Sequence, residues 1–463
     1  MACSARRWPR SRCHAREGAL FGTTLLESVQ TSVHLTWRSY GLLCAIALFG
    51  VAAQWGVSWL GPLWRALAAS LLLLLTLEAL RTRRQSVSCQ RELATQLYLG
   101  QSTHLALRLH NASNVPLAVQ LVQPLPASVH GKCDVLTYAL SAAGEQSRSL
   151  DVVPTALGEL QWQAPYARVR GSLGLAWWER RIAVAGSNTV VPDSLSTAER
   201  HRASADHGDT TSARSGQGFE LLGLRPYVSG DPLRAVDWKA SARSYQPWVR
   251  LFAQEQHLEL LLMLDCSRLS GLRAGALSRL ARSVNVAARL AEYALRQGNA
   301  VGLMTFSDRI HEQLPVSSAA SRLPALRTAL GRARTQAVEA SLLQAALAAR
   351  RMLGQRALVV VFSDLDVEDP GGQWLEGIKL LSARHLPLLA SVRDEALEQQ
   401  RNNKARAWRD PYDILAALEI EQAALTNHAR ARRLGARIIS ARAKELDGVV
   451  LAGYNEVRKR QRV

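Results

Sequence analysis

Carboxylate and hydroxyl side chains follow two apolar segments in the second half of the chain. Asp265 and Ser267 come directly after the run 258–264, and Asp364 follows the run 357–362. If both runs are strands of one parallel sheet, these side chains gather at the edge where such folds bind ligands. Carboxylate and hydroxyl oxygens suit Mg²⁺. The alternative is structural, because an aspartate in this place also caps a following helix.

Alternating strands and helices are predicted for residues 256–463. The expected strands are nearly continuous apolar runs, which are typical of a parallel sheet buried on both faces. They are 258–264, 300–306, 357–362, 386–392 and the weaker 437–440. Apolar residues at helical spacing predict helices at 277–297, 323–333, 341–353, 373–383 and 413–434. This alternation indicates a doubly wound α/β domain.

Residues 85–186 have a different pattern, in which short apolar runs alternate with polar residues. Leu105, Leu107 and Leu109 form one such run, and turn residues separate it from the next. A period of two with regular turn signals predicts an all-β, sandwich-like domain. Residues 187–217 are polar, rich in serine and without periodicity, so we expect a linker there.

Two apolar segments near the N-terminus are long enough to cross a membrane. Residues 39–64 carry no charge, and a second apolar stretch follows them. Since about 20 apolar residues span a bilayer, we expect a transmembrane hairpin over residues 39–84. Its two spans are placed at about 41–60 and 63–80, so residues 41–80 would contact the lipid bilayer.

Arginines flank both sides of this predicted hairpin. A basic segment, residues 1–38, precedes it, and Arg81, Arg83 and Arg84 follow it. The positive-inside rule then places both ends, and the bulk of the chain, in the cytoplasm. One span plus a buried helix is the alternative, but it would put one arginine cluster on the wrong side. A long signal peptide is disfavoured, because no small-residue cleavage site follows.

The composition excludes several classes of protein. The chain has 463 residues, which allows about three domains. A hydrophobic fraction of 48% excludes a mostly disordered chain. The formal net charge of +19 suggests a nucleic-acid partner, but only six of the 57 basic residues are lysines and the arginines are spread along the whole chain. We therefore expect no nucleic-acid partner.

Common catalytic signatures are absent from the sequence. It contains no GxxxxGK[ST] phosphate loop, no HExxH and no GxSxG. The six cysteines have no CxxC spacing, which argues against a zinc site and favours a reducing compartment. We accordingly expect that the protein is not an enzyme.

The segment 218–255 is dense in charged side chains. Arg225, Asp231, Arg234, Asp237 and Lys239 lie within a stretch of fifteen residues. An arginine and a carboxylate at this spacing can form a bidentate ion pair. A polar brace between domains and a binding surface both remain open.

This segment resembles the signature of the bacterial family called domain of unknown function 58. The stretch QGFELLGLRPYVSGDPLRAVDWKASAR carries the matching residues. They are Arg225, Tyr227, Gly230, Asp231, Arg234, Asp237, Trp238, Lys239 and Arg243. Leu221 stands where the family usually has Phe, and Val236 where it often has Ile. The membrane hairpin, the β-domain and the α/β domain also fit the layout of that family.

The resemblance implies that the α/β domain is similar to a von Willebrand factor A domain. Such domains bind a metal ion through a DxSxS loop, a threonine loop and an aspartate. Asp265 and Ser267 match the first loop and Asp364 the third, whereas Leu269 replaces the second serine. The threonine loop should fall near residues 335–342, where its usual sequence is missing. The implied cofactor is Mg²⁺ at a degenerate site.

The resemblance also implies a function. It is that of an adaptor or scaffold in the bacterial inner membrane, which works with a MoxR-type AAA+ ATPase in the assembly or maturation of a client protein. One alternative is a metal-dependent hydrolase that uses Asp265, Asp364 and Asp366. Another is a protein that binds anionic membrane surfaces through basic residues near the C-terminus. These are Arg430, Arg432, Arg433, Arg437, Arg458, Lys459, Arg460 and Arg462.

Overall fold

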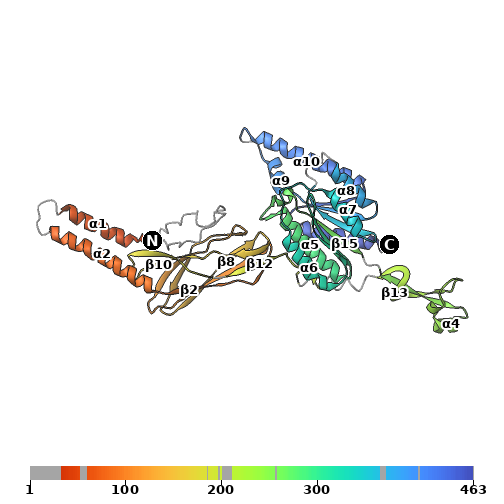
Figure 1. Ribbon diagram of the computed structural model, residues 1–463, viewed down its shortest axis with the longest axis horizontal. Coiled ribbons are helices and arrows are strands. Elements are labelled where there is room, and N and C mark those ends of the chain that lie inside the picture. The colour runs from red at the N-terminus through yellow and green to blue at the C-terminus, as the bar shows by residue number, and fades with distance from the viewer. Residues whose placement is uncertain are drawn as a thin grey trace. The chain divides into compact units, whose positions relative to one another are not determined.

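The computed structural model divides into two compact units, Met1–Val190 and Val191–Val463 (Figure 1). Their secondary structure and contacts are described for residues 33–52, 60–184, 186–196, 199–200, 211–255, 258–364, 372–404 and 407–461. Most of the basic N-terminal segment, residues 53–59 and Asp366 lie outside these ranges. The turn expected between the two spans, at Gly61 and Pro62, is wrong, because both residues lie in the first turn of a helix that begins at Leu60.

Two apolar helices follow a short strand at the start of the described part of the amino-terminal unit. They are α1 (Trp37–Ala52) and α2 (Leu60–Arg84), which pack against each other. By length and composition, Gly61–Thr82 can cross a membrane, whereas α1 has 16 residues in its described part. The structure therefore supports the second predicted span, and the end of the first lies outside the described residues.

Both helices hold the same turn of the β-rich region. Glu78 of α2 is fully buried, and its Oε1 accepts the backbone N–H groups of Leu173 at 3.1 Å and Leu175 at 3.2 Å. Ser39 of α1 donates to the Leu175 carbonyl. A Cβ at Gly171 would collide with the Glu78 carboxylate, so this turn requires glycine there. The one acidic residue of the apolar stretch is thus a structural link between helix and sheet.

Antiparallel strands make up the rest of the unit, and the predicted β-rich region is confirmed. The five-stranded sheet has the order β1 (Val33–Leu35), β11 (Ala176–Arg181), β10 (Tyr166–Arg170), β5 (Leu117–Val122) and β7 (Leu136–Leu140). The four-stranded sheet has the order β2 (Val87–Glu92), β4 (Thr103–Asn111), β8 (Glu145–Pro154) and β6 (Val129–Gly131). The three-stranded sheet has the order β3 (Gln96–Tyr98), β12 (Ser187–Val191) and β9 (Gly158–Gln161).

Alternating burial explains why these segments become strands. Leu105, Leu107 and Leu109 of β4 are fully buried, and the residues between them are more exposed. Tyr138 of β7 donates a hydrogen bond of 2.9 Å to the Leu107 carbonyl, which ties the five-stranded sheet to the four-stranded one. A period of two is the spacing that places every second side chain in a core.

Two expected boundaries differ from the structure. Val33–Leu35, assigned to the basic N-terminal segment, pairs with β11, and Ser187–Val191, assigned to the linker, forms β12. In β12 the buried positions are Asn188 and Val190. Asn188 accepts a hydrogen bond of 2.9 Å from the Trp162 indole N–H. The sequence does not show the alternation of buried apolar and exposed polar residues in β12, because the buried position 188 is occupied by a polar asparagine.

The next residues of the expected linker are also fixed, here against the carboxy-terminal unit. Arg289 of helix α5 (Arg279–Arg296) pairs with Asp193 at 3.3 Å and also with Glu199. The backbone N–H of Leu195 donates to the buried Glu292 carboxylate at 3.3 Å. These ion pairs form between residues that are distant in sequence, so local composition does not reveal them.

The carboxy-terminal unit is built on a six-stranded sheet. Its order is β19 (Ile310–Ser317), β18 (Ala300–Phe306), β15 (Glu259–Asp265), β20 (Ala357–Phe362), β21 (Leu386–Val392) and β22 (Arg437–Ala441). Neighbouring strands are parallel except for β18 and β19, so β19 is an antiparallel edge. The predicted mixed α/β region is confirmed, and its five predicted strands are all present.

Helices cover both faces of this sheet (Figure 1). Met263 and Val361 point to the face that carries helices α7 (Leu342–Met352) and α8 (Gln373–Ser382). Helix α5 packs on β15 and β18 and also contacts α6 (Leu323–Arg332) and α11 (Leu446–Gln461). The remaining helices are α9 (Glu395–Asn402) and α10 (Asp410–Arg433). Burial on both faces accounts for the continuous apolar runs.

A two-stranded hairpin precedes this sheet in the chain. It consists of β13 (Thr211–Pro226) and β14 (Trp248–Glu255), with the short helix α4 (Trp238–Ser244) between them. The charged segment 218–255 covers most of it. The sequence predicts no strands here, because apolar and polar residues do not alternate regularly. The structure shows a related irregularity, since the pairing of β13 with β14 contains register shifts between Ser212 and Gly223.

Candidate functional site

The predicted site residues at the strand ends do gather at one edge of the sheet. Asp265 ends β15, Asp364 follows β20, and Asp394 follows β21. The three strands are parallel neighbours, so their carboxyl ends meet. Asp265 and Asp364 therefore lie at the same, carboxyl-terminal edge of the sheet, and ligand binding there stays a prediction.

Both carboxylate oxygens of Asp265 are engaged within the protein. The residue is 6% exposed, and its Oδ1 accepts the backbone N–H of Ser267 at 2.7 Å. Its Oδ2 accepts a hydrogen bond from the Ser363 hydroxyl. Burial raises the pKa of Asp265, and the hydrogen bonds from Ser363 and Ser267 oppose that rise. The Asp265 side chain thus links the loop after β15 to the loop after β20.

Asp364 forms an ion pair with Arg279, which no motif in the sequence indicates. The guanidinium of Arg279 lies 2.8 Å from Asp364 and 3.0 Å from Asp394. The side chains of Arg279 and Asp364 are only 6% and 8% exposed. One guanidinium thus bridges the carboxylates that follow two neighbouring strands. Asp394 also caps α9, because it accepts the N–H groups of Ala396 and Leu397.

One signal in the sequence could have identified Arg279. It is the first residue of helix α5, where the positive end of the helix dipole disfavours a cation. It also lies between Leu277 and Leu280, which face the core. A cation at the start of an otherwise apolar helix indicates a carboxylate partner nearby.

As they stand, these residues do not fit a divalent cation. Asp364 already neutralises Arg279, and Leu269, at the position of the second serine, offers no oxygen. The described residues contain no group of three or more His, Cys, Asp or Glu side chains that could hold a metal ion. Magnesium binding by Asp265, Ser267 and Asp364 remains a prediction, and it requires that Arg279 leaves Asp364.

The loop expected to supply the threonine does lie beside the first loop. The backbone N–H of Gln336 donates to the Cys266 carbonyl at 2.7 Å, and that of Arg268 donates to Val338 at 2.9 Å. The Ser341 hydroxyl, however, donates to Gln373 at 3.3 Å. The hydrolase alternative also needs Asp366, which lies outside the described residues. No step of a reaction follows from this arrangement.

In the signature hairpin, one ion pair shapes the turn after β13. Arg225 donates two hydrogen bonds, of 2.7 and 2.6 Å, to the two oxygens of Asp231. This contact lowers the pKa of Asp231, and the N–H of Val228 lowers it further. Gly230 has a φ of +108°, a conformation that L side chains rarely adopt. Arg225, Gly230 and Asp231 therefore act as a framework.

Asp237 starts helix α4 by a similar structural contact. Its side chain accepts the N–H groups of Lys239 and Ala240 at 3.1 and 3.0 Å, which is the geometry of an N-cap. Ser241 links the helix to β14, because its hydroxyl accepts the Trp248 N–H at 2.8 Å. Tyr227 is held through its backbone N–H, which donates to Pro247 at 2.8 Å.

The remaining matched residues project from this framework into solvent. Trp238 is 68% exposed, and Arg234, Lys239 and Arg243 are also exposed. Within the described part of the chain, none of these three cations has an ion pair or a side-chain hydrogen bond. Further exposed apolar side chains belong to the same hairpin. We call the whole set the signature surface: Val228, Leu233, Arg234, Trp238, Lys239, Arg243 and Tyr245.

Solved structures show only distant likeness to this chain. The conserved hypothetical protein BatB from Bacteroides thetaiotaomicron is 15% identical, with 44% of this chain and 99% of that chain covered and a TM-score of 0.30. A CARDB domain from Pyrococcus furiosus is 9% identical, with 23% and 93% covered and a TM-score of 0.17. At such scores the likeness carries no argument.

Sequence relatives are closer. Uncharacterized proteins of Mycobacterium tuberculosis and Mycobacterium bovis are 29% identical to this chain over 199 residues. The match covers 41% of this chain and 59% of the relatives, so it spans about three fifths of their length.

A family model describes the same region of the chain. Residues 223–403 match the model of the family "Protein of unknown function DUF58". This range begins within β13 and includes the signature hairpin, Asp265, Arg279 and Asp364. The resemblance seen in the sequence is therefore confirmed, and residues 223–403 are similar to the DUF58 family.

Proposed function

We propose that this protein is a membrane-anchored adaptor that docks a partner protein on the signature surface. The observation that carries the proposal is the exposure of Trp238 beside Arg234, Lys239 and Arg243, none of which pairs with a described residue. Exposed apolar patches rimmed by polar groups are typical of protein–protein contact. Tryptophan, tyrosine and arginine are also the residue types that dominate binding energy at interfaces.

The framework beneath the signature surface supports this assignment. Arg225 and Asp231 shape the turn, and Asp237 caps α4, so the exposed side chains stand on a preorganised support. Rigid presentation lowers the entropy cost of binding. A partner that fits should carry an acidic rim around an apolar recess that accepts Trp238.

We infer that the partner is a MoxR-type AAA+ ATPase, acting with the adaptor on a client protein. The family likeness suggests this class, and the cationic signature surface suits an acidic docking partner. The α/β unit would serve as a von Willebrand A-like interaction domain. The helices α1 and α2 would form a hairpin in the bacterial inner membrane, and the bulk of the chain would be cytoplasmic.

Co-purification tests the partner directly. The full chain in phosphatidylcholine nanodiscs is incubated with lysate of its source bacterium, with ATP, with ADP and without nucleotide. We expect capture of a MoxR-type ATPase in at least one state, and loss of capture for Trp238→Ala. Absence of any AAA+ ATPase under all three conditions would contradict the proposal.

Magnesium at the strand ends has a separate test. Bound ligand raises the melting temperature in proportion to its binding free energy. If Asp265, Ser267 and Asp364 take Mg²⁺, millimolar Mg²⁺ should raise the melting temperature of the wild type and leave that of Asp364→Asn unchanged. Equal melting temperatures with and without Mg²⁺ would remove the metal from the account.

A further inference from the structure

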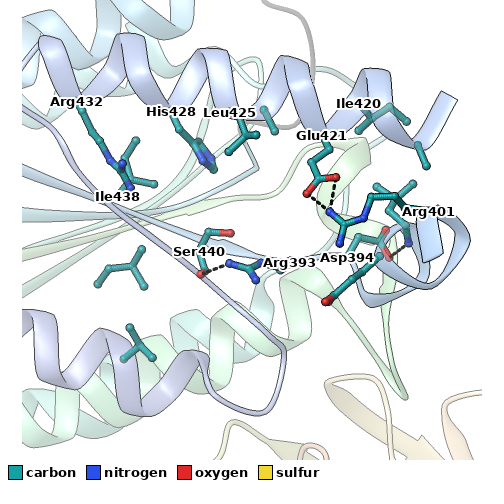
Figure 2. A pocket seen from close by; sticks show the side chains of 16 residues that line it. Arg393, Asp394, Arg401, Ile420, Glu421, Leu425, His428, Arg432, Ile438 and Ser440 are labelled. Atoms are coloured by element: carbon teal, nitrogen blue, oxygen red, sulfur yellow. Dashed lines mark hydrogen bonds and ion pairs between the residues drawn. The ribbon is translucent and has the colours of Figure 1, made fainter. Parts of the chain in front are cut away.

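A cavity of about 490 Å³ lies at the far edge of the six-stranded sheet (Figure 2). It is enclosed by α9, one side of α10, the edge strand β22 and α11. Its volume falls within the range of about 300–1,000 Å³ that is usual for small-molecule sites. None of its lining residues belongs to the signature surface or to the Asp265 loop, but Asp394 is shared with the strand-end ion pairs of Arg279.

Much of the cavity wall is apolar and reachable from solvent. Ile420 and Leu425 line it from α10, Ile438 and Ile439 from β22, and Val449 from α11. Ile420, Leu425 and Val449 are all at least 39% exposed. Helix α10 therefore does not pack closely on the edge strand β22, and the cavity lies between their apolar side chains. Filling it with an apolar group would remove this surface from water.

The cavity lining holds three arginines and three carboxylates, and two further arginines outside the lining pair with these carboxylates. Its three carboxylates are each paired with an arginine: Asp394 with Arg279 at 3.0 Å, Glu398 with Arg442 at 2.9 Å, and Glu421 with Arg401 at 2.7 Å. The Arg442 guanidinium also lowers the pKa of Glu398, so this carboxylate is ionised near neutral pH. Glu398 and Glu421 are each neutralised by their own arginine, whereas Asp394 shares the single charge of Arg279 with Asp364, so five arginines face four carboxylates here.

Two lining arginines have no carboxylate within ion-pair distance among the described residues, although the charge of Arg393 also helps to lower the pKa of Glu398. Arg393, which follows β21, makes a side-chain contact of 3.4 Å with the Ser440 carbonyl, longer than the usual 2.7–3.2 Å. Arg432 has no side-chain hydrogen bond or ion pair with any residue that the structure describes. Figure 2 shows Arg393 directed toward Ser440 and Arg432 reaching from α10 toward Ile438. The apolar cavity therefore carries a surplus of positive charge.

We propose that this cavity binds a small anionic amphiphile. Its single apolar chain would lie against Ile420, Leu425 and Val449, and its carboxylate or phosphate head group would accept hydrogen bonds from Arg393. Arg432 adds positive potential from α10. A cationic ligand is disfavoured by the surplus charge, and a neutral one would form no charge-assisted hydrogen bond with Arg393.

Photo-crosslinking of the full chain in phosphatidylcholine nanodiscs tests this proposal. A diazirine-bearing analogue of oleate should label peptides from α10 and from the β22–α11 region. Unlabelled oleate or 1-oleoyl lysophosphatidate should compete at least about tenfold more effectively than neutral monooleoylglycerol, since charge-assisted hydrogen bonds are the strong ones. Comparing the two anions distinguishes a free fatty acid from a phospholipid product.

Matched variants assign the label to the cavity. Arg393→Gln should weaken labelling about tenfold, and Ala424→Trp, which fills the cavity without changing charge, should abolish it. Arg433→Gln is the control, because this exposed neighbour of Arg432 does not line the cavity. Equal competition by monooleoylglycerol, labelling confined to Gly61–Thr82, or undiminished labelling of Arg393→Gln and Ala424→Trp at wild-type melting temperature would overturn the proposal.

Discussion

The strand-end loops and the signature hairpin both concentrate charge, but they use it in opposite ways. At the strand ends, Arg279 bridges Asp364 and Asp394, and Asp265 accepts hydrogen bonds from Ser267 and Ser363. On the signature surface, Arg234 and Lys239 have no described partner, and Trp238 is mostly exposed.

This difference separates structural charges from binding charges. A buried ion pair is expensive to break, since removal of one partner leaves an uncompensated charge in the interior. An exposed cation without a partner contributes little to stability and is available for another molecule. The same residue types therefore maintain the fold in one region and are available for binding in the other.

The largest effect is expected at Arg279. Arg279→Met leaves Asp364 buried without its cation, which should cost about 3–5 kcal/mol. Hydrogen exchange reports this locally: the amides of β15 and β20 should exchange at least about a hundredfold faster, at about 1.4 kcal/mol per factor of ten.

The double variant Arg279→Met with Asp364→Asn provides the control for that experiment. It removes the unpaired charge, so protection should recover in part. Wild-type exchange in Arg279→Met would show that the ion pair does not support the sheet.

Gly230 tests the framework of the hairpin. Alanine at a φ of +108° should cost about 1–3 kcal/mol locally. The Asp231 amide, which donates to Val228 at 3.0 Å, should lose protection from hydrogen exchange. Gly223→Ala is the matched control, because a Cβ there meets nothing within 4 Å. Similar protection in both variants would mean that the turn does not depend on this glycine.

The buried carboxyl of Asp265 should make stability depend on pH. Burial raises its pKa in the folded state, so protonation favours folding. Its stabilising contribution is complete below its ordinary pKa of 3.8 and is lost as the pH rises through the raised value. Asp265→Asn should therefore gain stability relative to the wild type between acidic and neutral pH, in urea unfolding at several pH values. A constant difference would contradict the raised pKa.

The smallest effect on stability is expected on the signature surface. Trp238→Ala and Lys239→Ala should each change the free energy of unfolding by no more than about 0.5 kcal/mol, because surface substitutions rarely do more. Urea unfolding of both variants measures this. A loss above about 1 kcal/mol for Trp238→Ala would mean that the tryptophan supports the hairpin itself.

The sequence predicted those features that depend on local periodicity. Continuous apolar runs identified the five parallel strands of the six-stranded sheet but not its antiparallel edge strand β19, and the ends of these runs placed Asp265 and Asp364 at one edge. The sequence did not predict the role of Arg279, because its two carboxylate partners lie 85 and 115 residues further along the chain. Strand β12 was also missed, since its inward-facing Asn188 is polar and buries itself through a hydrogen bond with Trp162.

The sequence identified the signature residues as one group, but it could not show which of them support the hairpin and which are exposed for binding. Arg225 and Arg234 look alike in one dimension, and only the contact with Asp231 shows that the first belongs to the framework. The burial and the ion pairs of individual side chains are set by the folded chain. They determine which charged residues are free to bind another molecule, and the sequence alone does not reveal them.

The central claim is that the signature surface binds the partner protein and that the strand-end carboxylates do not take part in this contact. Its most direct test measures the affinity of the purified MoxR-type ATPase for the full chain in nanodiscs, with wild type, Trp238→Ala plus Arg243→Ala, and Asp265→Asn. We expect the double variant to bind at least about tenfold more weakly, as for an interface hot spot, with unchanged hydrogen exchange in β15. Asp265→Asn should bind as the wild type does. Wild-type affinity of the double variant, together with loss of binding in Asp265→Asn, would contradict the account.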